Sequence, residues 1–194
     1  MSDVEAVERA VVFFCAEADG LTAADLGRRT PCAGWDVRAL HGHVVGLYDA
    51  LANALHGERV DLIAASGDLR ENPVLALEDG AAGMMRAWQE PGALDRTLET
   101  TVRDMPAALA TRIVVGDSLL HGWDLARAFG RPVTMPEDLA AAQLAMMQQY
   151  YDPAARGPGR GFDIAVDWPD NATVQERLVA LSGRDASWSE VSAP

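Results

Sequence analysis

Apolar residues recur at spacings of three and four positions in six stretches of the chain, which is the period of an amphipathic α-helix. The first stretch opens with the capping-box pair Ser2 and Glu5, and the second opens at Asp36, a good N-cap residue. The third opens with Pro73 at the first helical position. The pattern predicts helices over about 3–18, 36–56, 72–89, 106–129, 136–151 and 172–181.

The segments between these stretches show little β-type patterning. Residues 94–102 alternate enough to indicate one short strand or an extended linker, and 162–168 could form a short extended piece. We therefore predict an all-α fold with at most a very short β segment. We expect a single domain over 1–194, in which an antiparallel four-helix bundle covers about 3–130. The C-terminal helices and tail, about 131–194, pack outside it.

Charge and composition narrow the function classes. The formal net charge is −13, from 29 acidic residues against 16 basic ones, and every basic residue is arginine. Such a charge disfavours nucleic acid and anionic membranes as partners. The absence of lysine excludes a Schiff-base or P-loop lysine. With no long apolar run and no signal pattern at the N-terminus, we expect a cytoplasmic protein.

The two cysteines, Cys15 and Cys32, do not indicate an oxidising compartment. Cys15 lies in an apolar run and suits the core of a packed helix. Cys32 lies just before the helix that begins near Asp36, and a helix N-terminus can lower the pKa of a thiol. We expect burial to be the role of Cys32 as well.

The most informative chemistry lies on the predicted helix over 106–129. Asp117 and His121 are four residues apart, so a carboxylate and an imidazole share one helix face. His43 borders the apolar stripe of the helix over 36–56 and could add a second imidazole. Two His and one carboxylate form a three-ligand zinc-type site, which leaves a fourth position for water or substrate. Asp124 could accept from a ring N–H of His121 or add a further oxygen ligand.

Each of these residues also has an ordinary structural interpretation. His43 alone could be a hydrogen-bonded packing residue, and Asp117 with His121 could be a plain surface pair. Asp124 could pair on the surface with Arg127 or Arg103.

Three further residues are pocket candidates with equally ordinary alternatives. Trp35 and Trp123 flank the ligand helices, where they could form a pocket wall or simply anchor the core. Arg38 could bind a carboxylate, as could Arg86 or Arg112, although surface charge explains any one of them.

Two separated motifs resemble one known family. The run Thr-Pro-Cys-Ala-Gly-Trp-Asp-Val-Arg-Ala-Leu-His-Gly-His over 30–43 resembles a signature of the mycothiol-dependent maleylpyruvate isomerase N-terminal domain family. The run His-Gly-Trp-Asp-Leu-Ala-Arg-Ala over 121–128 is similar to that family's second signature. The tail over 175–185 resembles the end of a compact actinobacterial metal-binding branch. Two linked motifs are much more specific than either one alone.

This resemblance implies a DinB-like four-helix bundle that holds a divalent metal, usually zinc. Independently of the resemblance, Ni²⁺, Co²⁺ and Fe²⁺ are alternatives, because metal availability often decides which ion such a site holds. The resemblance assigns the ligand roles to His43, Asp117 and His121; the isomerase has Glu where this chain has Asp117. It also implies mycothiol as the thiol cosubstrate, which the metal would activate for attack on an electrophile such as an unsaturated keto acid, an epoxide or a xenobiotic.

Three hypotheses follow. The first is a mycothiol-dependent transferase or isomerase, whose partners are a small-molecule thiol and an electrophilic substrate. The second is a non-catalytic DinB-like metal-binding protein of stress response or of unknown role, and the third is a helical bundle whose polar core is structural and holds no metal. Two Met and two Tyr residues within 146–151 could form an exposed apolar patch through which the protein forms a homodimer. Packing of a C-terminal helix against them explains these residues equally well.

Overall fold

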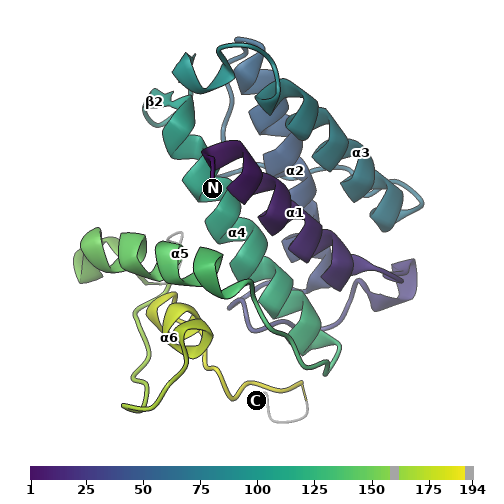
Figure 1. Cartoon of the computed structure of the whole chain (residues 1–194). Coiled ribbons are helices and arrows are strands. Elements are labelled where there is room, and N and C mark those ends of the chain that lie inside the picture. Colours follow the sequence, from purple (N-terminus) through teal and green to yellow (C-terminus); the bar gives the residue numbers. More distant parts are fainter. Residues whose placement is uncertain (158–161, 191–194) are drawn as a thin grey trace.

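The computed structural model describes residues 1–157 and 162–190, and it is mostly helical, as predicted (Figure 1). Each predicted helix is present, with both ends within two residues of the expected positions. The helices are α1 (Asp3–Ala18), α2 (Val37–Leu55), α3 (Pro73–Trp88), α4 (Ala107–Ala128), α5 (Glu137–Gln149) and α6 (Val174–Leu181).

Local hydrogen bonds explain where several helices begin. The Ser2 side chain accepts from the Glu5 N–H in a complete capping box, and Thr173 does the same for α6. The Asp36 carboxylate accepts from the Ala39 N–H at 2.8 Å and so begins α2. Each cap satisfies backbone donors that have no partner inside the helix. The position of α2, which carries His43, is therefore set by its own sequence.

The remaining elements are short. Within the described residues, 3₁₀ turns cover Ala23–Asp25 (η1), Ala93–Asp95 (η2) and Pro153–Ala155 (η3). Strand β1 (Thr97–Leu98) pairs antiparallel with β2 (Met105–Pro106), so the predicted strand exists inside 94–102 and finds its partner just before α4. Along 162–168, the structure has no strand; the Val166 N–H donates to the Ala180 carbonyl.

Helices α1 to α4 share one core. Helix α1 packs on α4 and α3, and α2 packs on the same two helices. Helix α5 contacts α4, and α6 packs against α5 (Figure 1). Leu139 and Leu144 of α5 and Leu178 of α6 belong to the same buried core cluster, so the C-terminal helices extend this core. In the described ranges, no helix has both the length and the apolar content needed to cross a membrane. The largest fully buried side chains include Phe14, Leu40, Tyr48, Leu51, Leu77, Met84, Leu119 and Leu125.

Candidate metal site

His43, Asp117 and His121 converge where α2 packs on α4. One ligand atom from each lies within 4.8 Å of the other two. The Nε2 atom of His121 is 3.5 Å from Asp117 Oδ1, and the Nε2 atom of His43 is 3.9 Å from the same oxygen. Two imidazole nitrogens and one carboxylate oxygen thus lie close together; spacing within α4 predicted the approach of Asp117 and His121, and the packing of α2 on α4 adds His43.

A buried hydrogen bond sets the two helices against each other beside this cluster. The hydroxyl groups of Tyr48 on α2 and Ser118 on α4 are 2.8 Å apart, and both side chains are fully buried. Breaking such a contact leaves a buried polar group unpaired, so it resists sliding of one helix along the other. Because Ser118 is adjacent to Asp117, the same hydrogen bond fixes the position of Asp117 along the helix axes relative to His43.

The far nitrogen of each imidazole has a partner that orients the ring. His43 Nδ1 lies 3.3 Å from the Ala65 carbonyl oxygen, and His121 Nδ1 lies 3.0 Å from Asp124 Oδ2. A carbonyl oxygen only accepts, so Nδ1 of His43 carries a proton in this bond; whenever Nε2 is unprotonated, its lone pair points toward Asp117 and is free to bind a metal. The Asp124 carboxylate selects the same tautomer of His121. Metal-binding histidines characteristically have such partners.

Glycines bring the Ala65 carbonyl within reach of His43. A Cβ atom on Gly46 of α2 would lie 2.4 Å from the Ser66 backbone nitrogen, so only glycine allows the 65–67 segment to cross the helix this closely. The Gly67 N–H donates to the Gly42 carbonyl at 2.7 Å and holds the crossing in place. The orientation of His43 therefore depends on a loop that the helical pattern does not reveal.

Asp124 has a partner that the sequence analysis missed. Its side chain is fully buried, and the guanidinium of Arg184 donates to it through Nη2 at 2.8 Å and Nε at 3.1 Å. Asp124 is thus not a surface residue paired with a nearby arginine; Arg127 instead donates to the Trp188 carbonyl. The only sequence signal for Arg184 was the tail motif.

Opposite charges dominate the electrostatics of the cluster. Burial alone would lower the pKa of His121, but its contacts with Asp117 and Asp124 outweigh burial and raise it. Burial would likewise raise the pKa of Asp117, yet the facing imidazoles of His121 and His43 hold it well below its usual range. For Asp124, Arg184 is the strongest influence that offsets burial, and the pKa is again lowered. Both carboxylates are therefore anionic at neutral pH, as metal binding requires.

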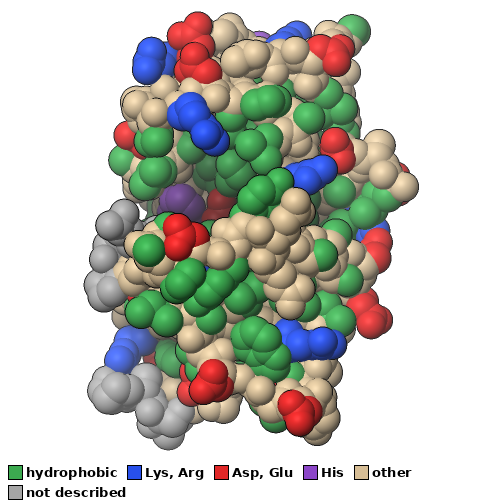
Figure 2. All heavy atoms as spheres, turned by 90° about the vertical axis from the view of Figure 1, so that its left-hand side faces the viewer, with side chains coloured by type: hydrophobic (Ala, Val, Ile, Leu, Met, Phe, Trp, Pro, Cys, Tyr) green, Lys and Arg blue, Asp and Glu red, His purple; other side chains and the backbone are tan. Residues whose placement is uncertain are grey.

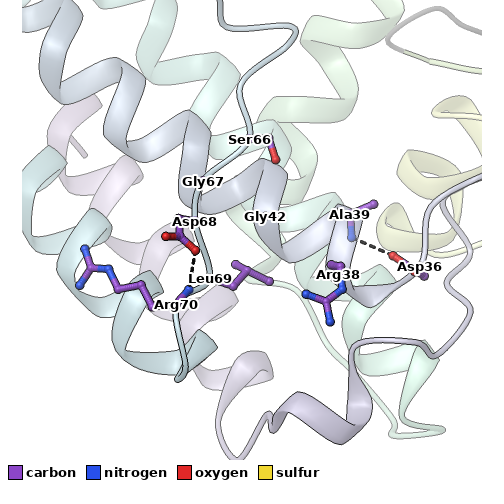
Figure 3. Close-up of a pocket in the computed structure, with 9 residues that line it drawn as sticks. All are labelled: Asp36, Arg38, Ala39, Gly42, Ser66, Gly67, Asp68, Leu69 and Arg70. Carbon is purple, nitrogen blue, oxygen red and sulfur yellow. Dashed lines mark hydrogen bonds between the residues drawn. The ribbon is translucent and has the colours of Figure 1, made fainter.

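The three pocket candidates lie in different places. The Trp35 ring stacks on His121, with centroids 5.5 Å apart, and tilts over His43 at 4.9 Å. Trp123 is buried and lies under the guanidinium of Arg127. Arg38 lines a pocket of about 410 Å³ between the start of α2 and residues 66–70, which none of the three cluster residues lines (Figure 3). Trp35 is the candidate that directly contacts the cluster.

Cys32 lies close to the cluster, beside His121 and Asp124. Its thiol lies within 4.8 Å of ligand atoms of His121 and Asp124. Burial raises the pKa of Cys32 to about 12, and Asp124 is already neutralised by Arg184. Burial also raises the pKa of Cys15 to about 11. Both cysteines are free and partly buried.

The cluster is open to solvent on one side. The exposed fraction of the side chain is 22% for Asp117, 13% for His43 and 7% for His121. Figure 2 shows a histidine side chain beside a hollow in the surface, with acidic atoms visible inside it. Asp117 is thus the most exposed of the three side chains.

Comparison with known proteins identifies relatives of the whole chain. Residues 7–126 match the family model described as the mycothiol maleylpyruvate isomerase N-terminal domain. Uncharacterized proteins from two strains of Mycobacterium tuberculosis are each 29% identical over 188 residues, which is 95% of this chain and 98% of theirs.

Two solved structures share the fold. The crystal structure of the mycothiol-dependent maleylpyruvate isomerase is 17% identical, with a TM-score of 0.65 over 95% of this chain and 89% of that one. A point variant of that isomerase aligns with a TM-score of 0.62 at 18% identity, over 82% of this chain and 72% of its own.

Proposed function

Because the chain belongs to the mycothiol maleylpyruvate isomerase N-terminal domain family, we propose that it binds a divalent metal and uses a low-molecular-weight thiol such as mycothiol. The reaction we propose is a transfer or isomerisation of an electrophilic substrate. One observation carries the proposal: the Nε2 atoms of His43 and His121 and the Oδ1 atom of Asp117 face a common point from two helices.

The donor set and its spacing fit a small divalent ion. Zn²⁺ binds imidazole nitrogen and carboxylate oxygen at about 2.1 Å, so a tetrahedral arrangement separates ligand atoms by about 3.4 Å. The two distances to Asp117 Oδ1, 3.5 and 3.9 Å, are close to that separation. We assign the ligand roles to His43, Asp117 and His121, with zinc as the first choice and Ni²⁺, Co²⁺ or Fe²⁺ as alternatives.

Three protein ligands leave a coordination position for a small molecule, which is typical of catalytic rather than structural sites. A bound divalent ion lowers the pKa of a thiol and so supplies a thiolate nucleophile near neutral pH. The protein contributes orientation: the Ala65 carbonyl and Asp124 hold the two imidazoles, and Trp35 packs against both rings. The side of the cluster next to Asp117 is where thiol and electrophile would enter.

Thermal stability of the metal-loaded protein tests the proposal. A ligand that binds only the native state stabilises it by mass action and so raises the melting temperature. At a free ligand concentration of 100 Kd, the free energy of unfolding increases by about 2.7 kcal/mol. We expect zinc to stabilise the wild type and mycothiol to stabilise the zinc-loaded protein further. In Asp117→Asn, which keeps the side-chain volume, neither effect should appear.

The outcomes separate the alternatives. Stabilisation by zinc without any effect of mycothiol would favour the non-catalytic metal-binding protein. No stabilisation by zinc, Ni²⁺, Co²⁺ or Fe²⁺ would contradict the metal site itself and leave a bundle with a polar core.

A further inference from the structure

The segment after α6 enters the protein beside the candidate metal site. Gly183 turns the chain with φ of +90°, and a Cβ atom there would lie 2.5 Å from Asp163 Cβ. Because only glycine suits this turn, the direction of the next residue is fixed. Arg184 points inward, is 6% exposed, and donates through Nη1 to the Ser182 carbonyl as well as to Asp124.

The guanidinium fixes the orientation of the Asp124 carboxylate. Its Nε atom lies 3.1 Å from Oδ1 and its Nη2 atom 2.8 Å from Oδ2, a two-point contact that a planar guanidinium makes with a carboxylate. The same Oδ2 accepts from His121 Nδ1 at 3.0 Å. A chain of hydrogen bonds therefore runs from Arg184 through Asp124 to His121, and the far side of that imidazole faces Asp117.

We propose that Arg184 is a positioning residue of the metal site, which holds Asp124 so that the His121 ring stays aimed at the metal position. The C-terminal segment would thus set the metal affinity of a site built on α2 and α4. This inference rests on the proposed function. It concerns a residue outside the range 7–126 that the family model matches.

Arg184 could act by orienting Asp124 or simply by holding the segment after α6 in place, and a second arginine, Arg127, allows the two roles to be distinguished. Arg127 of α4 donates through Nε and Nη2 to the Trp188 carbonyl, four residues after Arg184. It therefore ties down the same segment at a different point. If anchoring alone mattered, loss of either arginine would have the same effect on metal binding.

The experiment measures zinc affinity by competition with a chelating dye in Arg184→Gln and Arg127→Gln. Removing a partner of a metal ligand typically costs 10–100-fold in metal affinity. We expect a loss of about that size in Arg184→Gln and less than about threefold in Arg127→Gln. Arg184→Lys keeps the charge but not the two-point contact, so its affinity should fall between wild type and Arg184→Gln.

A double variant tests whether Arg184 acts through Asp124. Once Asp124→Asn has removed the carboxylate, adding Arg184→Gln should weaken zinc binding no further. The visible spectrum of the Co²⁺-loaded protein provides a readout of ligand geometry, and we expect it to change in Arg184→Gln but not in Arg127→Gln. Circular dichroism shows which variants are folded; if Arg184→Gln is not, Arg184→Lys carries the test.

Two results would overturn the inference while leaving the proposed function intact. One is wild-type zinc affinity in a folded Arg184→Gln or, in its place, Arg184→Lys. The other is an equal loss in Arg127→Gln and Arg184→Gln, which would indicate anchoring alone. Failure of the wild type to bind zinc, Co²⁺, Ni²⁺ or Fe²⁺ would contradict the proposed function itself.

Discussion

Replacing Gly46 by alanine should destabilise the protein even though alanine is the better helix former. Gly46 lies inside α2, where the substitution by itself favours the helix by about 1 kcal/mol. The new Cβ atom, however, would lie 2.4 Å from the Ser66 nitrogen and 2.5 Å from the Gly67 nitrogen, about 1 Å short of ordinary contact at 3.4 Å. These are backbone atoms, so the loop must move as a whole.

The size of the effect follows from these two opposing contributions. Overpacking that forces the backbone to shift costs about 1–3 kcal/mol. After subtraction of the helix gain, we expect Gly46→Ala to lower the free energy of unfolding by up to about 2 kcal/mol. The shift should also move the Ala65 carbonyl, which is the hydrogen-bond partner of His43. Loss of such a partner weakens metal binding by at least about 10-fold, so we expect a fall of about that size in zinc affinity.

Urea denaturation and zinc titration measure the two effects, and Gly83→Ala is the matched control. Gly83 lies inside α3, and the nearest atom to its added Cβ is the end of the Arg86 side chain at 3.8 Å. This substitution should raise the free energy of unfolding by about 0.5–1 kcal/mol and leave zinc affinity unchanged. If both alanines stabilise the protein and both leave zinc affinity unchanged, the close crossing of α2 by residues 65–67 is not what orients His43.

Three further predictions concern single side chains. Asp117→Asn should weaken zinc binding by more than about 100-fold, because a ligand contributes more than a supporting partner; binding within 10-fold of wild type in a dye competition would contradict its role. Tyr48→Phe should lower the free energy of unfolding by about 1–2 kcal/mol in urea denaturation, since Ser118 is left unpaired; an unchanged value would show that this bond contributes nothing. Burial, reinforced by the charge of Glu78, raises the pKa of Cys15 to about 11 from 9.0, so the folded state keeps a proton that the unfolded state loses. Stability should therefore fall as pH rises from 9 to 11, by at most about 1.4 kcal/mol per pH unit. Cys15→Ala should show a shallower fall in urea denaturation at pH 8 and pH 10, and identical slopes would count against the shift.

The helices could be predicted because the information that defines them is local. Capping residues such as Ser2, Asp36 and Thr173 lie within three residues of the donors they satisfy, and the apolar period is visible over every long helix. Strand β1 was harder to predict, because its partner β2 is a two-residue segment with no alternation of its own.

The candidate site could be predicted only in part, for the same reason. Asp117 and His121 follow from spacing within one helix, whereas His43 depended on the guess that α2 and α4 are neighbours. The supports of the site come from distant positions without a periodic pattern. Arg184 reaches Asp124 across 60 residues of sequence, and the Ala65 carbonyl is a backbone atom of an irregular loop. Most residues of α4 are buried, so its sequence has no clear polar face that separates exposed from buried positions. The pattern therefore did not reveal that Asp124 lies inside the protein.

Metal analysis of the purified, untagged protein tests the central claim most directly. Elemental analysis of the wild type beside His121→Ala should find about one equivalent of divalent metal per chain in the first and little in the second. His56→Ala is the control, because His56 lies at the exposed end of α2 and pairs with Glu90 away from the site. No metal in the wild type, even after incubation with zinc, or equal metal in all three proteins, would contradict a metal site at His43, Asp117 and His121.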